Sequence, residues 1–197
     1  MIPVAQQPEP SNFDQKVRKP GLAWIDEKGF DPTKRVPKKT KIEPFWRQSI
    51  EDLHSAYSGI CAYLCVFIEL AAPPTVDHFV PKSERLDLAY EWGNYRLAFS
   101  TLNSKKGVFQ DVLDPFTLSP NTFELNLFDG SISSAKHLGI AETSSAQMTI
   151  IRLDLDAPKW RKMRLRHWQI YIRNRDGEFL QTHSPFVWLE AQRQGLL

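Results

Sequence analysis

The fold of this chain is decided by the stretch Thr75-Val76-Asp77-His78-Phe79-Val80-Pro81-Lys82. Residues 75–80 favour a strand, and Pro81 with the polar residues after it predicts where that strand ends. Neighbouring side chains of a strand point to opposite faces, so Asp77 and His78 can serve one site only at a strand end or a distortion. The stretch therefore predicts a polar site where a strand stops.

Two asparagines complete the candidate site: Asn94 lies sixteen residues after His78, and Asn103 lies nine residues further on. The carboxylate of Asp77 and the amide oxygen of Asn103 are ligands that suit Mg2+ or Mn2+, with water and a phosphate in the remaining positions. A neutral imidazole with a pKa near about 6.5 can take a proton from an attacking water. The pattern predicts metal-assisted hydrolysis of a phosphodiester, with His78 as general base.

These residues resemble the HNH endonuclease family, whose ββα-metal motif consists of Asp-His, a loop Asn, a helical His or Asn, and a basic Lys-Gly end. The resemblance makes Asp77 and Asn103 the metal ligands. It also makes His78, Asn94 and Asn103 the catalytic set, in which Asn94 ties the loop and holds the backbone of the catalytic His.

The resemblance extends to bacterial HNH proteins of poorly characterised subfamilies, some of which are encoded beside phage-defence components. The segments that carry it outside the motif are Met1-Ile2-Pro3-Val4, Phe13-Asp14, Val17-Arg18-Lys19-Pro20-Gly21, Gly59-Ile60-Cys61-Ala62-Tyr63-Leu64-Cys65, Ala89-Tyr90-Glu91-Trp92-Gly93-Asn94-Tyr95-Arg96-Leu97, Asp111-Val112-Leu113-Asp114-Pro115-Phe116 and Gln192-Arg193-Gln194-Gly195.

One departure from the family concerns zinc. Many HNH proteins brace the motif with a zinc ion held by two Cys-x-x-Cys pairs. Here Phe99 and Leu102 stand in place of the second pair, and Cys65 follows Cys61 one position too late for the first. Two thiols cannot complete a tetrahedral structural site. We therefore expect no structural zinc, apolar packing by Leu64, Phe99 and Leu102 in its place, and the catalytic ion as the one metal.

Each residue also has a simpler interpretation. An Asp-His dipeptide arises by chance, and a single His at a strand end is commonly a surface or hydrogen-bonded residue. Asn103 also suits a helix surface or cap. The combined spacing of the four residues, with Lys105-Lys106-Gly107 at the helix end, favours the catalytic interpretation.

Basic residues are gathered in two places, although the net charge of +2 is too small to indicate nucleic-acid binding by itself. The stretch Lys34-Arg35-Val36-Pro37-Lys38-Lys39-Thr40-Lys41 contains five basic residues and no acidic one. It fits either an arm that follows a phosphate backbone or a solvated linker. The second group, between Lys159 and Arg166, is spread around a predicted helix and favours a solvated face.

The sequence thus predicts an endonuclease that cuts nucleic acid, with DNA as the expected partner. The phosphate contacts nearest the site are expected from Lys82, Arg96, Lys105 and Lys106. Two alternatives stay open: a catalytically idle nucleic-acid-binding module, and a defence or toxin effector whose activity depends on a protein partner.

The length and composition of the chain limit the size of its core and its expected location. With 197 residues, 42% of them hydrophobic, the chain can bury one ordinary core with an appended lobe. It has no run of eighteen apolar residues and no signal pattern at its start, so a cytoplasmic location without membrane insertion is expected. Two cysteines four residues apart favour reduced, core-facing thiols.

We expect an α+β fold with three parts: an extended basic arm over residues 1–43, an HNH core of ββα-metal type over residues 44–116, and a mainly helical lobe over residues 117–197. Asp111 and Asp114 favour a turn over a metal site. The expected elements are a helix over 44–57, strands over 60–70 and 75–80 joined by 71–74, a loop or short helical turn over 86–92, a helix over 95–106, a strand over 123–128 that opens a hairpin, and helices over 142–155, 157–173 and 186–191.

Overall fold

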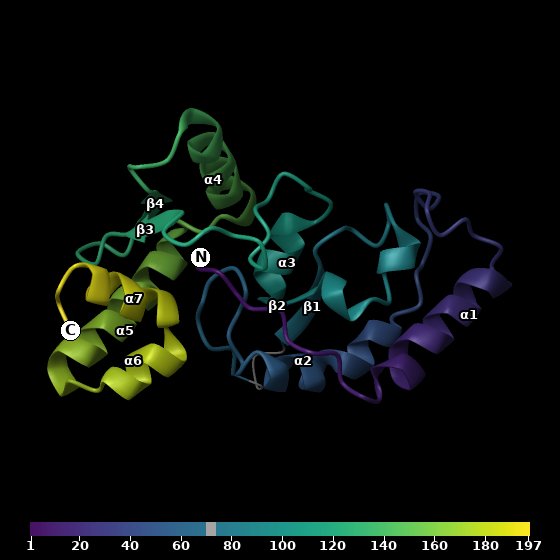
Figure 1. Cartoon of the computed structure of the whole chain (residues 1–197), viewed down its shortest axis with the longest axis horizontal. Coiled ribbons are helices and arrows are strands. Elements are labelled where there is room, and N and C mark those ends of the chain that lie inside the picture. Colours follow the sequence, from purple (N-terminus) through teal and green to yellow (C-terminus); the bar gives the residue numbers. More distant parts are fainter. Residues whose placement is uncertain (70–73) are drawn as a thin grey trace. The chain divides into compact units, whose positions relative to one another are not determined.

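The computed structural model describes residues 1–69 and 74–197 (Figure 1). Contacts within the chain divide it into two compact units. Unit 1 consists of Met1–Ala5, Ile60–Ile68 and Asp111–Leu197, and unit 2 consists of Gln6–Gly59 and Glu69–Gln110. Each unit contains helices and a two-stranded antiparallel sheet. The chain is therefore of mixed helix and strand, as predicted.

Unit 2 contains two strands and a helix in direct succession. Strand β1 (Pro74–His78) pairs antiparallel with β2 (Tyr95–Phe99), so that Asp77 lies opposite Arg96. Helix α3 (Ser100–Lys106) begins where β2 ends and stops at Gly107, whose φ of 51° belongs to the region that glycine tolerates best. The loop between the strands contains two 3-10 turns, η3 (Leu86–Leu88) and η4 (Trp92–Asn94).

The strand predicted over residues 60–70 is wrong for the part that the structure describes. The backbone turns back on itself there, Ile60 bridges to Phe67, and Cys65 has a φ of 55°. A short apolar run shows burial in the sequence but does not distinguish a strand from a buried loop. The connection predicted over residues 71–74 falls outside the described residues except for Pro74, the first residue of β1.

The helix predicted over residues 95–106 is wrong in its first half. Tyr95–Phe99 forms β2, because pairing with β1 satisfies its backbone groups, and only the second half is helical. Strand preference depends on the neighbouring strand more than on the residues themselves, so a tertiary contact overrides the local pattern.

The segment before residue 44 has more regular structure than predicted. It forms a π-helical turn, η1 (Asp14–Arg18), that continues into α1 (Lys19–Glu27). Pro20 has no N–H to bond back to the preceding helical turn, and it directly follows the wider π-helical turn of η1. The helix predicted over residues 44–57 is confirmed as η2 (Phe45–Ser49) followed by α2 (Ile50–Ala56).

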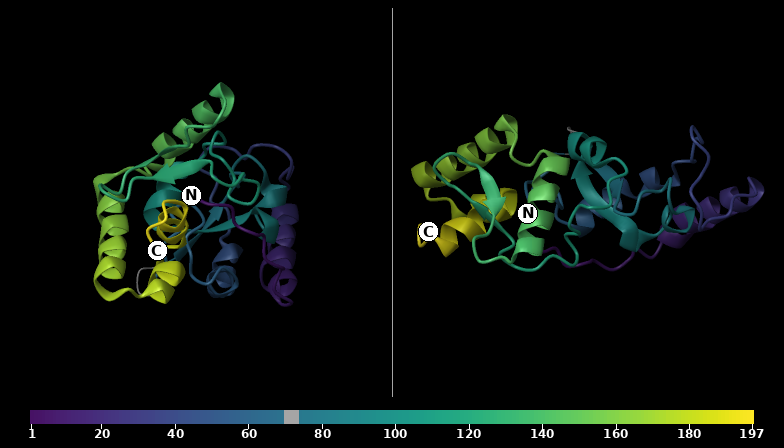
Figure 2. Two further views of the ribbon diagram at one scale, coloured as in Figure 1. Left: turned by 60° about the vertical axis from the view of Figure 1, so that its left-hand side comes forward. Right: turned by 90° about the horizontal axis from the view of Figure 1, so that it is seen from above.

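Unit 1 contains a small hairpin and four helices. The hairpin pairs β3 (Phe123–Leu125) with β4 (Ile132–Ser134), which confirms the predicted hairpin in a shorter form. The helices are α4 (Ile140–Leu153), α5 (Pro158–Asn174), α6 (Gly177–His183) and α7 (Pro185–Arg193). Three of them were predicted and α6 was not. Figures 1 and 2 show α5, α6 and α7 side by side.

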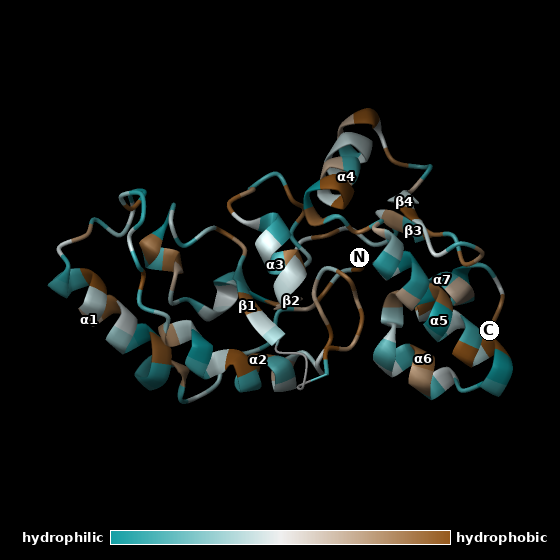
Figure 3. Cartoon of the chain, turned by 180° about the vertical axis from the view of Figure 1, so that it is seen from behind, coloured by the Kyte–Doolittle hydropathy of each residue, from teal (hydrophilic) through white to brown (hydrophobic). Residues whose placement is uncertain are grey.

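Helix α5 is amphipathic, and Figure 3 shows hydrophilic and hydrophobic residues alternating along it. Its buried face carries Trp160, Arg164, Trp168 and Tyr171, which are three or four positions apart. The expected solvated face is therefore wrong for Arg164. Its guanidinium lies in the core and donates hydrogen bonds to the carbonyl oxygens of Gly130 (2.9 Å) and Leu155 (2.7 Å).

Among the residues that the structure describes, no helix is long and apolar enough to cross a membrane.

Candidate active site

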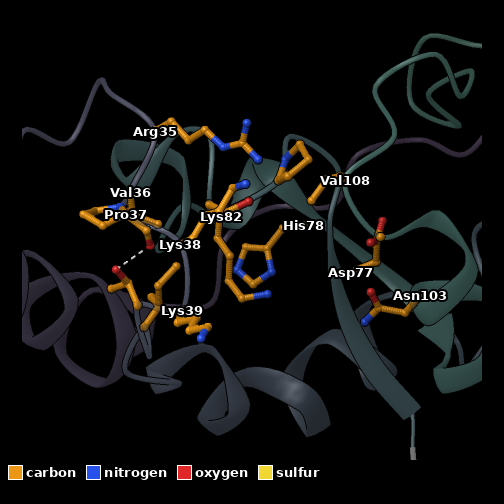
Figure 4. A pocket seen from close by; sticks show the side chains of 15 residues that line it. Arg35, Val36, Pro37, Lys38, Lys39, Asp77, His78, Lys82, Asn103 and Val108 are labelled. Atoms are coloured by element: carbon orange, nitrogen blue, oxygen red, sulfur yellow. Dashed lines mark hydrogen bonds between the residues drawn. The ribbon is translucent and has the colours of Figure 1, made fainter.

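A cavity of about 350 Å³ lies in unit 2 at the end of β1. Asp77 and His78 are the last two residues of that strand and both line the cavity, because the strand stops there and both of its faces reach the same space. Asn103 enters the lining from α3. In the view of Figure 4, the His78 ring lies between the basic segment on one side and Asp77 with Asn103 on the other.

Asp77 is 1% exposed and forms a buried ion pair. The ammonium group of Lys106 lies 3.3 Å from each of its two carboxylate oxygens. The same ammonium donates hydrogen bonds to the carbonyl oxygens of His78 (2.8 Å) and Phe79 (2.9 Å). One lysine of α3 thus neutralises the candidate metal ligand and holds the backbone at the end of β1.

Asn103 is tied to β1 by the nitrogen of its amide. That nitrogen donates to the hydroxyl of Thr75 (3.2 Å) and to the carbonyl oxygen of Val76 (3.0 Å). A carbonyl oxygen accepts only, so the donor must be the nitrogen, and the orientation of the amide is fixed. In Figure 4 the oxygen of this amide points toward the Asp77 carboxylate.

His78 is buried, with 5% of its surface exposed. Its Nε2 lies 2.9 Å from the carbonyl oxygen of Ala89, and the rings of Trp46 and Tyr95 pack edge to face against it. Burial, with the positive charge of Lys82, lowers the pKa of His78 to about 3. The ring is therefore neutral at pH 7, and its pKa of about 3 makes it a weaker proton acceptor than the imidazole with a pKa near about 6.5 that the sequence predicted. Because Nε2 must donate to Ala89, Nδ1 is left as the proton acceptor.

Asn94 holds the loop between the strands. Its side-chain oxygen accepts from the backbone N–H of Val80 (2.8 Å), and its nitrogen donates to the carbonyl oxygens of Val80 and Leu88 (3.0 Å each). These bonds fix the backbone two residues after His78. Asn94 itself is 7% exposed and does not line the cavity.

Lys82 lies in the cavity wall near His78. Its ammonium stands over the ring of Trp46, 5.1 Å from the ring centre, which is a cation–π arrangement. Burial lowers the pKa of this lysine from its ordinary value, while the charge of Asp77 opposes the shift. Lys82, Trp46 and His78 therefore form one contact group at the cavity.

The basic segment forms a second wall. Arg35, Lys38 and Lys39 line the cavity. The segment is attached there by a backbone hydrogen bond from Val36 to Ser83 (2.9 Å) and by an ion pair between Arg35 and Glu84 (3.1 Å). The sequence indicated a basic stretch but not its location, because no local pattern connects residues 34–41 with the end of β1.

The other predicted phosphate contacts lie elsewhere. Arg96 is 3% exposed and donates to the carbonyl oxygens of Gly93 and Tyr95 (2.9 Å each), so it supports the end of the loop. Lys105 is exposed on α3 outside the cavity lining. Lys106 is fully buried, so in this conformation its ammonium does not reach a ligand in solvent. The spacing places Lys106 on the same helix face as Asn103, and tertiary packing then decides that this face is the buried one.

Two acidic residues and two cysteines of unit 1 also have defined positions. Asp114 accepts a hydrogen bond from the backbone N–H of Phe116 (3.0 Å), which confirms the predicted turn, and Asp111 pairs with Arg152 (3.0 Å). Cys61 and Cys65 are buried, reduced cysteines. Within residues 1–69 and 74–197, no three His, Cys, Asp or Glu side chains lie close enough together to hold a metal ion.

The residues around the cavity fit a hard divalent ion with few protein ligands. One carboxylate, from Asp77, and one amide oxygen, from Asn103, are oxygen donors of the type that Mg2+ and Mn2+ bind, and such ions keep several water or phosphate ligands. A soft ion would require thiolates or more imidazoles. The two oxygen donors are therefore of the type that binds Mg2+ or Mn2+.

Comparison of the sequence with models of protein families gave no match, and comparison with curated proteins gave none either.

Proposed function

We propose that this protein is a metal-dependent endonuclease of the HNH type that acts on DNA in the cytoplasm. The observation that carries the proposal is the meeting of Asp77, His78 and Asn103 at one cavity, where β1 ends against α3. The order strand, loop asparagine, strand and helix agrees with the motif that the sequence resembles.

In the proposed reaction, Asp77 and Asn103 hold Mg2+ or Mn2+, which when bound stabilises the negative charge that develops on the phosphate. The neutral His78 takes a proton on Nδ1 from a water molecule. The oxygen of this water forms a new bond to phosphorus, and the bond between phosphorus and the leaving oxygen of the strand breaks. Ala89 keeps the ring in the tautomer that this step requires.

The charges around the cavity favour a phosphate-containing substrate. Arg35, Lys38, Lys39 and Lys82 line it, against one acidic lining residue, Asp77. These groups contact a sugar-phosphate backbone without reading bases, so the proposed cleavage depends little on sequence.

The test is cleavage of plasmid DNA with Mg2+ or Mn2+, followed on a gel. The wild-type protein should nick or cut the plasmid, and EDTA should stop the reaction. His78→Ala should lower the rate about a hundredfold or more, because a general base contributes on that order. Its DNA affinity should stay within about twofold. His137→Ala, at an exposed histidine of unit 1, is the matched control and should cut like the wild type. Cutting by a folded His78→Ala protein at the wild-type rate would remove His78 from its role.

A catalytically idle DNA-binding module is the second candidate, and the ion pair between Lys106 and Asp77 favours it, because the carboxylate already has a counter-ion. This candidate predicts DNA binding that is equal with and without EDTA, and no cutting under any metal. A partner-dependent effector predicts cutting that starts only when a second protein is added.

A further inference from the structure

The ion pair of Asp77 carries a further inference about the proposed active site. Lys106 is completely buried, and its ammonium contacts two backbone carbonyl oxygens as well as the carboxylate. An ammonium group has three donor hydrogens, and the carbonyls of His78 and Phe79 hold it in place independently of Asp77. A metal ion arriving at Asp77 would therefore meet a positive charge that does not move away easily.

The remaining lining of the cavity adds to this effect. Asp77 is the one acidic residue among the described residues that line the cavity, and Lys106 already balances its charge. The other charged lining residues are all basic: Arg35, Lys38, Lys39 and Lys82. Lys82 is half-buried, whereas Arg35, Lys38 and Lys39 are exposed and their charges are more strongly screened by solvent. A divalent ion alone would enter a cavity that is already positive, and two negative ligands would be needed to hold it well.

We propose that the metal ion and the phosphate of the substrate bind to this site as a unit, and that Lys106 makes the binding of each depend on the other. This inference rests on the proposed function. The phosphodiester supplies the negative charge that Asp77 cannot supply while it is paired, so the ion binds tightly only when the phosphate is present. Linkage requires the reverse as well: the ion raises the affinity for the phosphodiester by the same factor.

The binding of Mn2+ measures this coupling directly. Electron paramagnetic resonance reports the free Mn2+ that remains in a titration of the protein, and the binding of Mn2+ to DNA alone is subtracted. His78→Ala is used with a short DNA oligonucleotide, so that no cleavage occurs during the titration. Affinity for Mn2+ should rise at least tenfold with the ordinary oligonucleotide. It should stay within twofold with a methylphosphonate oligonucleotide, which has the same bases without the backbone charge.

Two variants at neighbouring positions of α3 test the role of Lys106. Lys106→Met removes the buried charge and keeps most of the side-chain length, so the protein without DNA should bind Mn2+ about tenfold more tightly, and the gain from DNA should shrink accordingly. Lys105→Met makes the same change in total charge at an exposed position and should leave the Mn2+ affinity of the protein without DNA within twofold. Equal affinities for the wild type and a folded Lys106→Met would overturn the inference. Should Lys106→Met fail to fold, the comparison of the two oligonucleotides decides.

The outcomes separate this inference from the proposed function. Mn2+ binding of equal strength with and without the phosphodiester, together with Mn2+-dependent cleavage by the wild type, overturns the coupling and leaves the endonuclease in place. No Mn2+ binding with either oligonucleotide, and no cleavage, overturns both.

Discussion

Asn94 illustrates how one side chain holds the backbone that carries the candidate base. Its amide makes three hydrogen bonds to Val80 and Leu88, and it does so while almost completely buried. A buried amide that lost these partners would leave several polar groups without a hydrogen bond, which costs more than the bonds contribute when formed.

Replacing Asn94 by Ala should therefore lower the free energy of unfolding by about 2 to 4 kcal/mol. Urea unfolding followed by circular dichroism measures the loss. Asn12→Ala, at an exposed asparagine of the same unit, should change stability by less than about 0.5 kcal/mol. Equal stability of Asn94→Ala and the wild type would mean that the loop does not depend on this side chain.

The sequence predicted the structural role of Asn94 but not the buried position of Lys106. The resemblance to HNH proteins gives the loop asparagine a structural role, and its hydrogen bonds to Val80 agree with that role. Lys105 and Lys106 looked alike in the sequence, as two basic residues at a helix end. Which of them faces inward depends on the rotation of α3 against β1, and that rotation is set by tertiary packing.

At the scale of elements, helix α1 is fitted closely to the loop between β1 and β2. Gly21 is buried in α1, and a Cβ added there would lie 2.2 Å from Cγ of Tyr90. Ala is normally the better helix former by about 1 kcal/mol. At Gly21 the contact with Tyr90 disfavours alanine, whereas helix propensity favours it. The contact should have the larger effect, because the buried ring of Tyr90 cannot move by the distance required.

Gly21→Ala should destabilise the protein by about 1 to 3 kcal/mol, the usual cost of overpacking a core. Thermal or urea unfolding tests this. Ala23→Gly, at an exposed position two residues along α1, measures the propensity difference without the clash and should cost about 1 kcal/mol. A gain in stability for Gly21→Ala would show that the ring of Tyr90 yields.

Helix α5 should make stability depend on pH through His167. This ring pairs with the hydroxyl of Ser184, and burial, with the positive charges nearby, lowers its pKa to about 4. The pKa in the unfolded chain is about 6.5, so between pH 4 and 6.5 the unfolded chain binds more protons and stability falls as the pH falls.

The change in the free energy of unfolding that His167 causes should be below about 1.4 kcal/mol per pH unit, the value for one fully titrating proton. The reason is that part of the ring reaches solvent. Urea midpoints at pH 5 and pH 7 measure it. In His167→Gln the difference between the two midpoints should shrink. An unchanged pH difference in that variant would assign the effect to other groups.

Elements were predicted best from the sequence where a helical repeat of apolar residues is bounded by a residue that starts or ends a helix. Helices α4 and α5 follow a helical repeat, and Pro158 marks the start of the second, so both were found to within about two residues. The strand pair was misassigned, because residues 60–70 and 95–99 are both rich in apolar residues and only the register with β1 decides between them. Local patterns do not contain that register.

At the scale of the whole molecule, each unit is assembled from separate segments of the chain. Residues 60–68 belong to unit 1, where the N–H of Phe67 bonds to the carbonyl oxygen of His183 (3.0 Å). Their side chains are almost entirely buried, including Tyr63 and Ile68, which have no exposed surface. The later part of the chain therefore covers a segment that, in the sequence, separates the two parts of unit 2.

A chain that ends at Gln110 should consequently aggregate, since residues 60–68 lose the segment against which they are buried. Size-exclusion chromatography after expression tests this. A chain that ends at Gln194 removes only exposed residues and should remain soluble and folded. A monomeric, folded chain of residues 1–110 would show that unit 1 is not needed to cover this segment.

The most direct test of the candidate site is the position of the metal ion. Crystals of His78→Ala with Mn2+ and a DNA oligonucleotide should give one anomalous peak at the end of β1, within coordinating distance of an Asp77 oxygen, the Asn103 amide oxygen and a phosphate oxygen. A peak at another place in a protein that cuts DNA, or an Asp77 carboxylate and an Asn103 amide that do not share the ion, would contradict the proposed site.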